Sequence, residues 1–308
     1  MSSQRIILMM ILMPRRERRM SSDIQRKNPA VMKNYLFNDL NYEDHLRTFP
    51  IHSLLGIDLD EYGELCAKQE NAPNNNVADH SSPHPPELDD LIRLHHLVLK
   101  RKVTTILEFG IGKSTVVLAH ALSINEARHG GFVRDELRRN NAFELHSVDN
   151  IPKWLEHVRG TLPSSFAGTD RVTLHHCPLV MGTFQDRVCT YYDGIPNICP
   201  DLIYLDGPDQ FSVEGSVRGI STRHKDRMPM VADILAFEHF LTPGTLIVVD
   251  GRTANAQFIK CNLQRTWTHT YIPSYDQHFF ELTEVPLGVF NKLQIDYCLG
   301  SDFYDRVK

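Results

Sequence analysis

The chain has 308 residues, enough for one large domain or two small ones with a substantial core. Its net charge is -5, whereas nucleic-acid-binding proteins usually have an excess of basic residues, so no nucleic-acid partner is expected. The six cysteines are widely scattered without a C-x-x-C pair, which argues against a zinc site or a disulfide framework and favours a reducing cytoplasm.

The first 86 residues precede the part of the chain that carries motifs. Residues 6–13 are apolar, but the run is too short to cross a bilayer and its basic residues follow it, so neither a transmembrane segment nor a secretory signal is expected. We predict that residues 1–32 form a disordered extension. Short helices over 42–49 and 59–69 would build an N-terminal cap, 33–86, which ends in a linker rich in Asn, Ser and Pro.

Residues 87–308 are predicted to form an α/β domain. Apolar residues recur at helical spacing over 87–102, and an apolar run at 103–108 predicts a buried strand. The strand ends in Glu108-x-Gly110-x-Gly112, and a helical pattern follows from Val116. Glycine permits a tight turn and a close ligand, and the unpaired amides of a helix start attract polar groups. The stretch is typical of the first nucleotide-binding turn in a doubly wound fold.

The glycine spacing in this turn separates three classes of ligand. Gly112-Lys113-Ser114 matches the end of a phosphate-binding P-loop, but the first glycine of that motif would fall at Leu107. A dinucleotide fingerprint needs a third glycine, and that position is Thr115. A third ligand class fits the spacing better.

Glu108-x-Gly110-x-Gly112-x-Ser114 resembles motif I of the class I S-adenosylmethionine-dependent methyltransferases, which have a Rossmann-like fold. The resemblance implies that the acid contacts the amino acid end of S-adenosylmethionine. It also implies that the glycines leave room for the methionine and ribose portions of this cofactor. Glu108, Gly110, Gly112 and Ser114 are therefore expected to bind it.

The next two predicted strands, over 143–149 and 171–177, extend the resemblance. In Rossmann-like folds an acid that ends the second strand accepts hydrogen bonds from ribose hydroxyls, and Asp149-Asn150 resembles motif II of the same family. The alternative role of Asp149 is to cap the helix that starts at residue 151. The family places the residues after the third strand beside the adenine, which would bring His176, Cys177 or Pro178 there. Of these, Cys177 is our candidate for the cofactor site.

A fourth strand is predicted over 200–206, and it ends at Asp206 directly before Gly207-Pro208. Ligands bind beyond the carboxyl ends of parallel strands, so Asp206 would face the same crevice as the motif I and motif II acids. The resemblance makes this stretch motif IV, which faces the transferring methyl and the acceptor. Asp206 is thus expected to contact the cofactor and is the first candidate for a catalytic base or orienting carboxylate. His224, in a charged segment over 211–230, is the second candidate.

The rest of the chain completes a sheet. The further predicted elements are a helix, a strand, a helix and the two strands of a hairpin, over 230–240, 245–250, 254–263, 267–272 and 278–282. The methyltransferase sheet ends in such a hairpin, with its last strand antiparallel. We therefore predict a doubly wound, mostly parallel seven-stranded sheet with a C-terminal antiparallel hairpin. Residues 289–297 are expected to add a short strand or to cover an edge.

The resemblance implies SN2 transfer of a methyl group from S-adenosylmethionine, and a small or saccharide acceptor methylated on oxygen is expected. The motif [DNS]-P-P-[YFW], usual in methyltransferases that act on DNA bases and amines, does not follow the fourth strand. Arg218, Arg223 and Arg252 are candidates for binding a carboxylate or phosphate of the acceptor.

A metal and two other functions stay open from the sequence. Asp206 and Asp250 end adjacent strands, as do the acids that hold Mg²⁺ in catechol-type O-methyltransferases, but Gly251 stands where those enzymes usually have Asn. One alternative function is a P-loop-like NTPase, with Asp206 or Asp250 as its Walker B acid. The other is a non-catalytic Rossmann-like protein that binds S-adenosylmethionine. The sequence does not indicate an oligomeric state.

Overall fold

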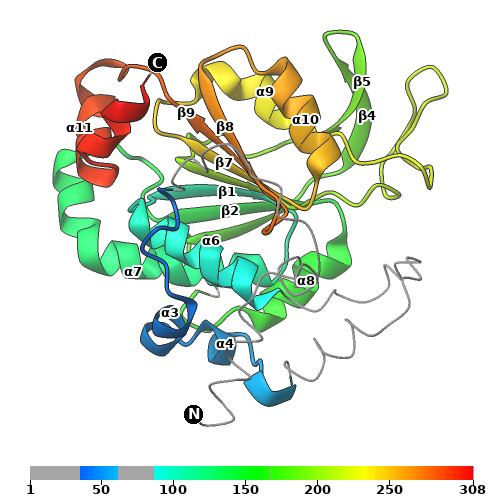
Figure 1. Ribbon diagram of the computed structural model, residues 1–308. Helices are drawn as coiled ribbons and strands as arrows, with labels where there is room; N and C mark the ends of the chain where they lie inside the picture. Colours follow the sequence, from blue (N-terminus) through cyan, green and yellow to red (C-terminus); the bar gives the residue numbers. More distant parts are fainter. Residues whose placement is uncertain (1–34, 62–86, 167, 308) are drawn as a thin grey trace, which may run out of the picture. The chain divides into compact units, whose positions relative to one another are not determined.

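The structure is a computed structural model that describes residues 35–61, 87–166 and 168–307 (Figure 1). Contacts within the chain divide it into two units, residues 1–97 and 98–308. The predictions for 1–32, for the linker at 71–86 and for most of the helix over 59–69 lie outside the described residues. The predicted domain boundary at residue 87 stays a prediction. Within the described ranges, no helix is long and apolar enough to cross a membrane.

The described part of the first unit includes the helices α3 (Tyr42–Thr48), α4 (Ile51–Leu54) and the beginning of α6 (Leu88–Lys100). Arg93 of α6 donates to the hydroxyl of Tyr42 at 2.9 Å, and ring nitrogens of His45 and His95 lie 2.9 Å apart. Polar contacts therefore join α3 to α6, and the helices predicted over 42–49 and 87–102 are confirmed.

The second unit is built on a seven-stranded sheet with the order β3-β2-β1-β6-β7-β9-β8. The strands in chain order are β1 (Thr105–Phe109), β2 (Glu144–Asp149), β3 (Val172–His176), β6 (Leu202–Leu205), β7 (Leu246–Asp250), β8 (Trp267–Ile272) and β9 (Gln277–Leu282). Neighbours are parallel from β3 to β7, and β9 runs antiparallel to both β7 and β8. This confirms the mostly parallel sheet with an antiparallel C-terminal hairpin.

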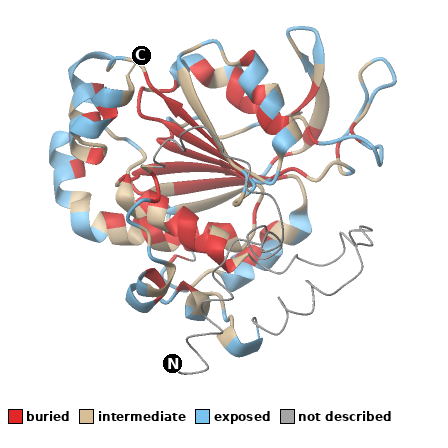
Figure 2. Ribbon diagram, in the orientation of Figure 1, coloured by how far each residue is buried: buried red, intermediate tan, exposed pale blue. Residues whose placement is uncertain are grey.

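Helices cover both faces of the sheet, as a doubly wound fold requires. In Figure 1, α7 (Lys113–Glu136) and α8 (Pro152–Thr161) lie on one face, and α9 (Asp233–Phe237) and α10 (Thr253–Asn262) lie on the other. The central strands β1 and β6 are buried along their whole length (Figure 2). Their continuous apolar runs follow from this burial on both faces.

The helical segments refine the sequence predictions. The helical pattern that starts at Val116 belongs to α7, which continues through the polar stretch after residue 126 as far as Glu136. Residues 289–297 lie in α11 (Gly288–Cys298), so the expected short strand is wrong. Val133 near the end of α7 and Cys298 of α11 share one buried apolar cluster, so these two helices pack against each other. The helix predicted over 230–240 begins only at Asp233 and ends in a 3-10 turn, Glu238–Phe240.

A second, two-stranded sheet was not predicted. It is the antiparallel hairpin β4 (Leu179–Phe184) and β5 (Arg187–Tyr192). Its turn residues, Gln185 and Asp186, have φ of 47° and 64°, the positive values of a type I′ turn without the Asn-Gly or Asp-Gly signal that predicts one. The segment after β6 follows both outer edges of the hairpin, since β4 bridges to residue 214 and β5 to residue 231.

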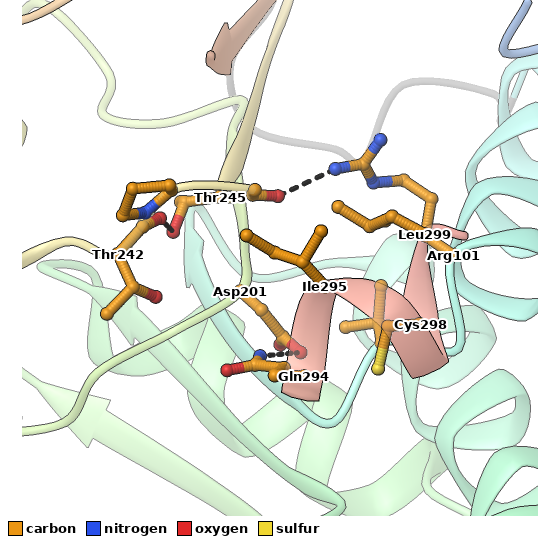
Figure 3. Close-up of a pocket in the computed structure, with 11 residues that line it drawn as sticks. Arg101, Asp201, Thr242, Thr245, Gln294, Ile295, Cys298 and Leu299 are labelled. Atoms are coloured by element: carbon orange, nitrogen blue, oxygen red, sulfur yellow. Dashed lines mark hydrogen bonds between the residues drawn. The ribbon is translucent and has the colours of Figure 1, made fainter. Parts of the chain in front are cut away.

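Buried charges join the sheet to the C-terminal segment at the amino ends of the strands. Arg101 donates to Glu281 at 2.8 Å and to the carbonyl of Gly244 at 2.7 Å, and Glu281 also accepts from Arg306 of the 3-10 helix Ser301–Arg306 at 2.8 Å. Arg101 and Gly244 line a cavity of about 20 Å³ (Figure 3). A cavity of this size holds about one water molecule, so it is too small for a substrate.

Replacing Arg101 by Met is expected to lower the free energy of unfolding by roughly 3 kcal/mol, because the buried Glu281 would lose a cationic partner. Urea denaturation measures the loss. Arg47 is the control: its side chain is 66% exposed beside Glu43 and Asp44, and Arg47→Met should cost less than about 1 kcal/mol. Equal losses in the two variants would contradict a stabilising role for the buried pair.

Candidate functional site

The strand order reverses between β1 and β6. The chain proceeds outward from β1 to β3 and then returns to the other side of β1 with β6. In doubly wound sheets this switch point opens a crevice at the carboxyl ends of the strands, where ligands bind. The turns after β1, β2 and β6 meet there, and these turns and the strand ends before them contain most of the site residues that the sequence predicted.

The turns after β1 and β6 touch backbone to backbone. The amides of Asp206 and Gly207 both donate to the carbonyl of Phe109, at 2.9 and 2.7 Å. A Cβ on Gly110 would lie 2.6 Å from the nitrogen of Gly207, and Gly110 has φ of +96°. Position 110 therefore requires glycine for two independent reasons. We call this contact between Gly110 and Gly207 the glycine joint.

Gly112 has a different environment from Gly110. Among the described residues, a Cβ on Gly112 would meet only the hydroxyl oxygen of Ser114, 4.0 Å away. Glycine at this position therefore leaves open space beside the turn, and a ligand that approaches the backbone would use that space.

The backbone amides of the turn after β1 all donate within the chain. Gly110 donates to a carbonyl of β2 at 2.9 Å, Ile111 donates to Asp149 at 3.0 Å, and Gly112 donates to the hydroxyl of Thr115 at 3.1 Å. A P-loop uses such amides to cradle phosphate oxygens. The turn therefore gives the P-loop alternative no structural support.

Glu108 is entirely buried and accepts three hydroxyl hydrogen bonds. The donors are Ser114 at 2.6 Å, Thr115 at 2.7 Å and Ser147 at 2.6 Å. Burial raises the pKa of Glu108 to about 7, although these three hydrogen bonds favour the ionised form. Its carboxylate joins β1 to β2 and to the first turn of α7. Its expected contact with the cofactor stays a prediction.

Asp149 holds the turns after β1 and β2 together. One carboxylate oxygen accepts from the amide of Ile111 at 3.0 Å and the other from the amide of Ile151 at 2.8 Å. The hydrogen bond from Ile151 is close to the helix-capping role that was the alternative for Asp149, because Ile151 is the residue that caps α8. Burial raises the pKa of Asp149. A ribose contact would have to use the remaining lone pairs of these oxygens.

Asn150 carries a buried acceptor that no group of the described chain satisfies. Its amide nitrogen donates to the hydroxyl of Ser212 at 2.9 Å, while its side-chain oxygen has no partner in the described ranges. Buried polar atoms in folded proteins nearly always have a partner. This orphan acceptor, directly after β2, fits a ligand that donates a hydrogen bond, as a ribose hydroxyl does.

Arg252, two residues after β7, holds the turn that carries Asp206. Its guanidinium donates to the backbone oxygens of Asp206 and Pro208, the latter at 2.7 Å, and its Nε lies 3.6 Å from the Asp206 carboxylate. The Asp206 side chain is 52% exposed. Arg252 therefore holds this turn in position, and its expected contact with an anion of the acceptor stays a prediction.

Asp206 and Asp250, the acids expected at a metal site, do not combine with the nearby amide residue Asn255 into such a site. Asp250 accepts from the hydroxyl of Tyr204 at 2.6 Å. Asn255, the amide residue that follows Gly251 in the sequence, exchanges two hydrogen bonds with the backbone of Val231, at 2.9 and 3.0 Å. These residues do not fit a catechol-type Mg²⁺ centre.

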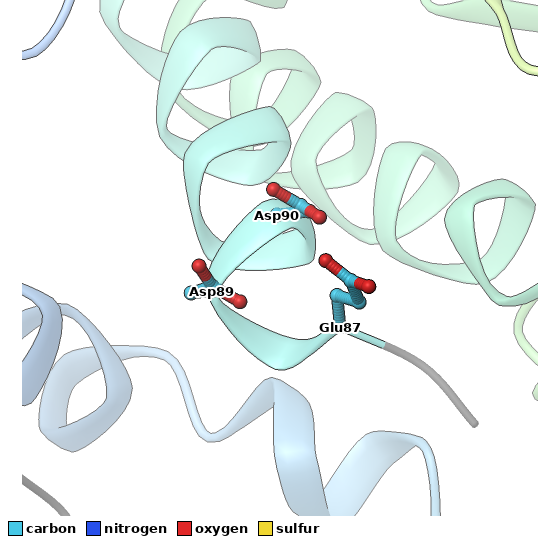
Figure 4. A group of neighbouring side chains, drawn as sticks. All are labelled: Glu87, Asp89 and Asp90. Atoms are coloured by element: carbon cyan, nitrogen blue, oxygen red, sulfur yellow. The ribbon is translucent and has the colours of Figure 1, made fainter. Parts of the chain in front are cut away.

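In the part of the chain that the structure describes, one acidic group has three carboxylates close enough to share an ion. It consists of Glu87, Asp89 and Asp90 at the beginning of α6 (Figure 4). Asp89 and Asp90 both contact the buried guanidinium of Arg93. The acids thus compensate a buried cation and suit the positive end of the helix dipole.

His224 and Cys177 lie outside these turns. His224 is 54% exposed, and its ring nitrogen accepts from the amide of Asp226 at 3.2 Å. Cys177 is buried in the main apolar cluster, where its thiol donates to the carbonyl of Gly194 at 3.4 Å. Burial raises the pKa of the Cys177 thiol. Their expected roles stay predictions.

Tyr192 and Asp233 are buried polar residues at this end of the sheet that the sequence analysis did not select. Tyr192 ends β5 and stacks on Phe109, with 5.6 Å between ring centroids. Asp233 accepts from the backbone amide of Tyr192 at 3.2 Å, and burial raises the pKa of Asp233 to about 7. No sequence signal pointed to them, because the hairpin that brings them together was not predicted.

Gly110→Ala is expected to lower the free energy of unfolding by at least about 2 kcal/mol, since the new Cβ would clash at the glycine joint in a backbone conformation that alanine disfavours. Thermal or urea denaturation tests this. Gly112→Ala is the matched control, because a Cβ there meets open space, and it should change stability by less than about 1 kcal/mol. If Gly110→Ala were as stable as the control, the joint would not be a close contact.

Glu108 and Asp233 are each expected to make stability fall as pH rises. The pKa of each is raised to about 7, so between about pH 5 and 7 the folded protein holds protons that the unfolded chain has lost. Each contribution is present below the ordinary carboxyl pKa and is lost as the pH passes about 7. Relative to Glu108→Gln or Asp233→Asn, the wild type should lose up to about 1.4 kcal/mol per pH unit in this window.

Urea denaturation at several pH values between 5 and 8 measures these differences. Comparing each variant with the wild type isolates one carboxyl group from the histidines that titrate in the same range. A wild-type curve parallel to that of the variant would show that the carboxyl group titrates at its ordinary pKa.

No protein-family model matches the chain, and no curated protein matches it in sequence. Solved structures similar to it include a methyltransferase from Geobacter sulfurreducens, with a TM-score of 0.39, 16% identity, and coverage of 80% of this chain and 95% of that one. An SAH-bound methyltransferase from Podospora anserina has a TM-score of 0.36 and 12% identity, covering 85% and 100%. An O-methyltransferase from Bacillus cereus in complex with SAH has a TM-score of 0.34 and 15% identity, covering 80% and 94%. Likeness at this level does not extend to substrates or activity.

Proposed function

We propose that the chain is an S-adenosylmethionine-dependent methyltransferase that methylates an oxygen of a small or saccharide acceptor. The observation that carries the proposal is the group of acids at the switch point. Glu108, Asp149 and Asp206 belong to three strand ends that meet beside the open space at Gly112. The half-exposed carboxylate of Asp206 favours a ligand with a sulfonium and an ammonium group over a triphosphate. The occupied turn amides support the same choice.

S-adenosylmethionine would supply a methyl group that its sulfonium has already activated. Within the chain, Asp149 and the orphan oxygen of Asn150 would accept hydrogen bonds from its ribose hydroxyls. Gly112 and Ser114, at the start of α7, would border its amino acid portion. Glu108 would act chiefly by holding that helix start in place through its three hydroxyl partners.

Asp206 is assigned the acceptor side of the reaction. Its half-exposed carboxylate, oriented by Arg252, would receive the proton that the acceptor hydroxyl loses as it attacks the methyl carbon. His224 is the second candidate for this base. Alignment of the two reactants supplies most of the remaining rate enhancement.

The segment after β6 is assigned to acceptor recognition. It follows the edges of hairpin β4–β5 and carries Arg218 and Arg223, both exposed. A carboxylate or phosphate on the acceptor would pair with these guanidiniums.

The five cysteines in the described residues are all free thiols, which suits the reducing cytoplasm that we expect for the protein.

Calorimetric titration of the full chain with S-adenosylmethionine tests the proposal, with ATP plus Mg²⁺ titrated in parallel. Micromolar binding of S-adenosylmethionine is expected, and Gly112→Ala should weaken it at least about tenfold by filling the open space while the protein stays folded. Lys113→Ala is the matched control and should leave this affinity unchanged. Binding of ATP that Lys113→Ala abolishes, without binding of S-adenosylmethionine, would instead assign the turn to a P-loop.

Turnover separates an enzyme from a binding protein. Hydroxylated small molecules and sugars, with and without an anionic group, should include an acceptor that is methylated. Asp206→Asn should then lower kcat by roughly 100-fold with little effect on the affinity for S-adenosylmethionine. Binding of the cofactor without turnover on any of these acceptors would favour the non-catalytic alternative.

A further inference from the structure

Tyr192 is held rigidly at the carboxyl end of the sheet, although it belongs to the separate hairpin. Its ring stacks on Phe109, the last residue of β1, with 26° between the ring planes. Its backbone amide is shared between the two carboxylate oxygens of Asp233, each 3.2 Å away. Ring and backbone are thus both fixed, which determines where the hydroxyl lies.

The Tyr192 hydroxyl lies at the glycine joint. A Cβ on Gly207 would come within 2.9 Å of the hydroxyl oxygen and within 2.7 Å of the backbone of Gly110. The charges of Asp149 and Arg252, from the turns after β2 and β7, both act on this hydroxyl. The two residues that meet beside it are glycines, so no side chain of theirs covers it.

This hydroxyl is a buried donor without an acceptor. Tyr192 is 4% exposed, and its hydroxyl has no hydrogen-bond partner within the ranges that the structure describes. The carboxylate of Asp149 instead receives backbone amides from Ile111 and Ile151. Burial raises the pKa of Tyr192 well above its ordinary value, so the hydroxyl keeps its proton. A buried donor left unpaired destabilises the protein unless something else accepts from it.

We propose that the Tyr192 hydroxyl donates a hydrogen bond to an oxygen of the bound cofactor, at the point where the turns after β1 and β6 meet. The inference rests on the proposed function. S-adenosyl compounds offer carboxylate and ribose oxygens as acceptors, whereas a sulfonium cannot accept a hydrogen bond. Hairpin β4–β5 thereby contributes a binding residue from outside the parallel sheet.

Tyr192→Phe removes the hydroxyl alone and keeps the ring on Phe109. The Kd for S-adenosylhomocysteine, measured by calorimetry on the full chain, should rise roughly three- to tenfold. The Tm of the ligand-free protein should stay the same or increase, because the variant loses an unpaired buried donor. Tyr191→Phe is the matched control. Tyr191 is the adjacent residue, and its hydroxyl donates to the carbonyl of Thr183 at 3.3 Å. Removing that hydroxyl should leave the Kd for S-adenosylhomocysteine unchanged.

Two results would overturn the inference while the proposed function stands. One is wild-type affinity for S-adenosylhomocysteine in Tyr192→Phe. The other is a lower Tm of the ligand-free variant, which would show that the hydroxyl already has a buried partner such as an ordered water. Absence of S-adenosylhomocysteine binding to the wild type would overturn the proposed function and this inference together.

Discussion

The close backbone contact between Gly110 and Gly207 is the constraint on which the rest of the site depends. It places the turns after β1 and β6 against each other at the one position where the strand order reverses. No side chain could occupy either position without moving a strand end. Because the joint fixes the turn after β6, the carboxylate of Asp206 is brought to the same edge as the turn after β1. The second fixing point of this turn is Arg252, which approaches from β7.

The acids that the resemblance marked as ligand contacts also hold the backbone in place. Glu108 receives three hydroxyls and Asp149 receives two amides, so each carboxylate satisfies groups of the chain before a ligand arrives. Buried acids of this kind lose part of their solvation and gain it back only through such donors. The half-exposed carboxylate of Asp206 lies at the end of the neighbouring strand, where it favours cationic over anionic ligands. Local structure therefore depends on the same two side chains that the resemblance marked as ligand contacts.

The sheet was predictable from the sequence because its signals are local. Apolar runs that end in Glu108, Asp149 and Asp206 follow from burial on both faces, and two aromatic runs around a five-residue loop predicted the antiparallel hairpin. Hairpin β4–β5 was not predicted because its turn residues, Gln185 and Asp186, adopt positive φ although they are not the Asn-Gly or Asp-Gly pair that usually does so. Arg252 contacts the turn after β6, and Tyr192 contacts Phe109 and Asp233. These contacts join positions more than forty residues apart, and no spacing rule relates such positions.

The two sides of the crevice are therefore built by different means. On one side, the turns after β1 and β2 depend on strand ends and on the beginning of α7, which the fold itself fixes. On the other side, hairpin β4–β5 and the segment after β6 are tied to each other through bridges at residues 214 and 231, outside the main sheet. A substitution in the hairpin or in the segment after β6 would therefore change which acceptor binds, without disturbing the sheet. Tyr192 is the exception, because it belongs to the hairpin and yet lies at the glycine joint, so it couples the two sides.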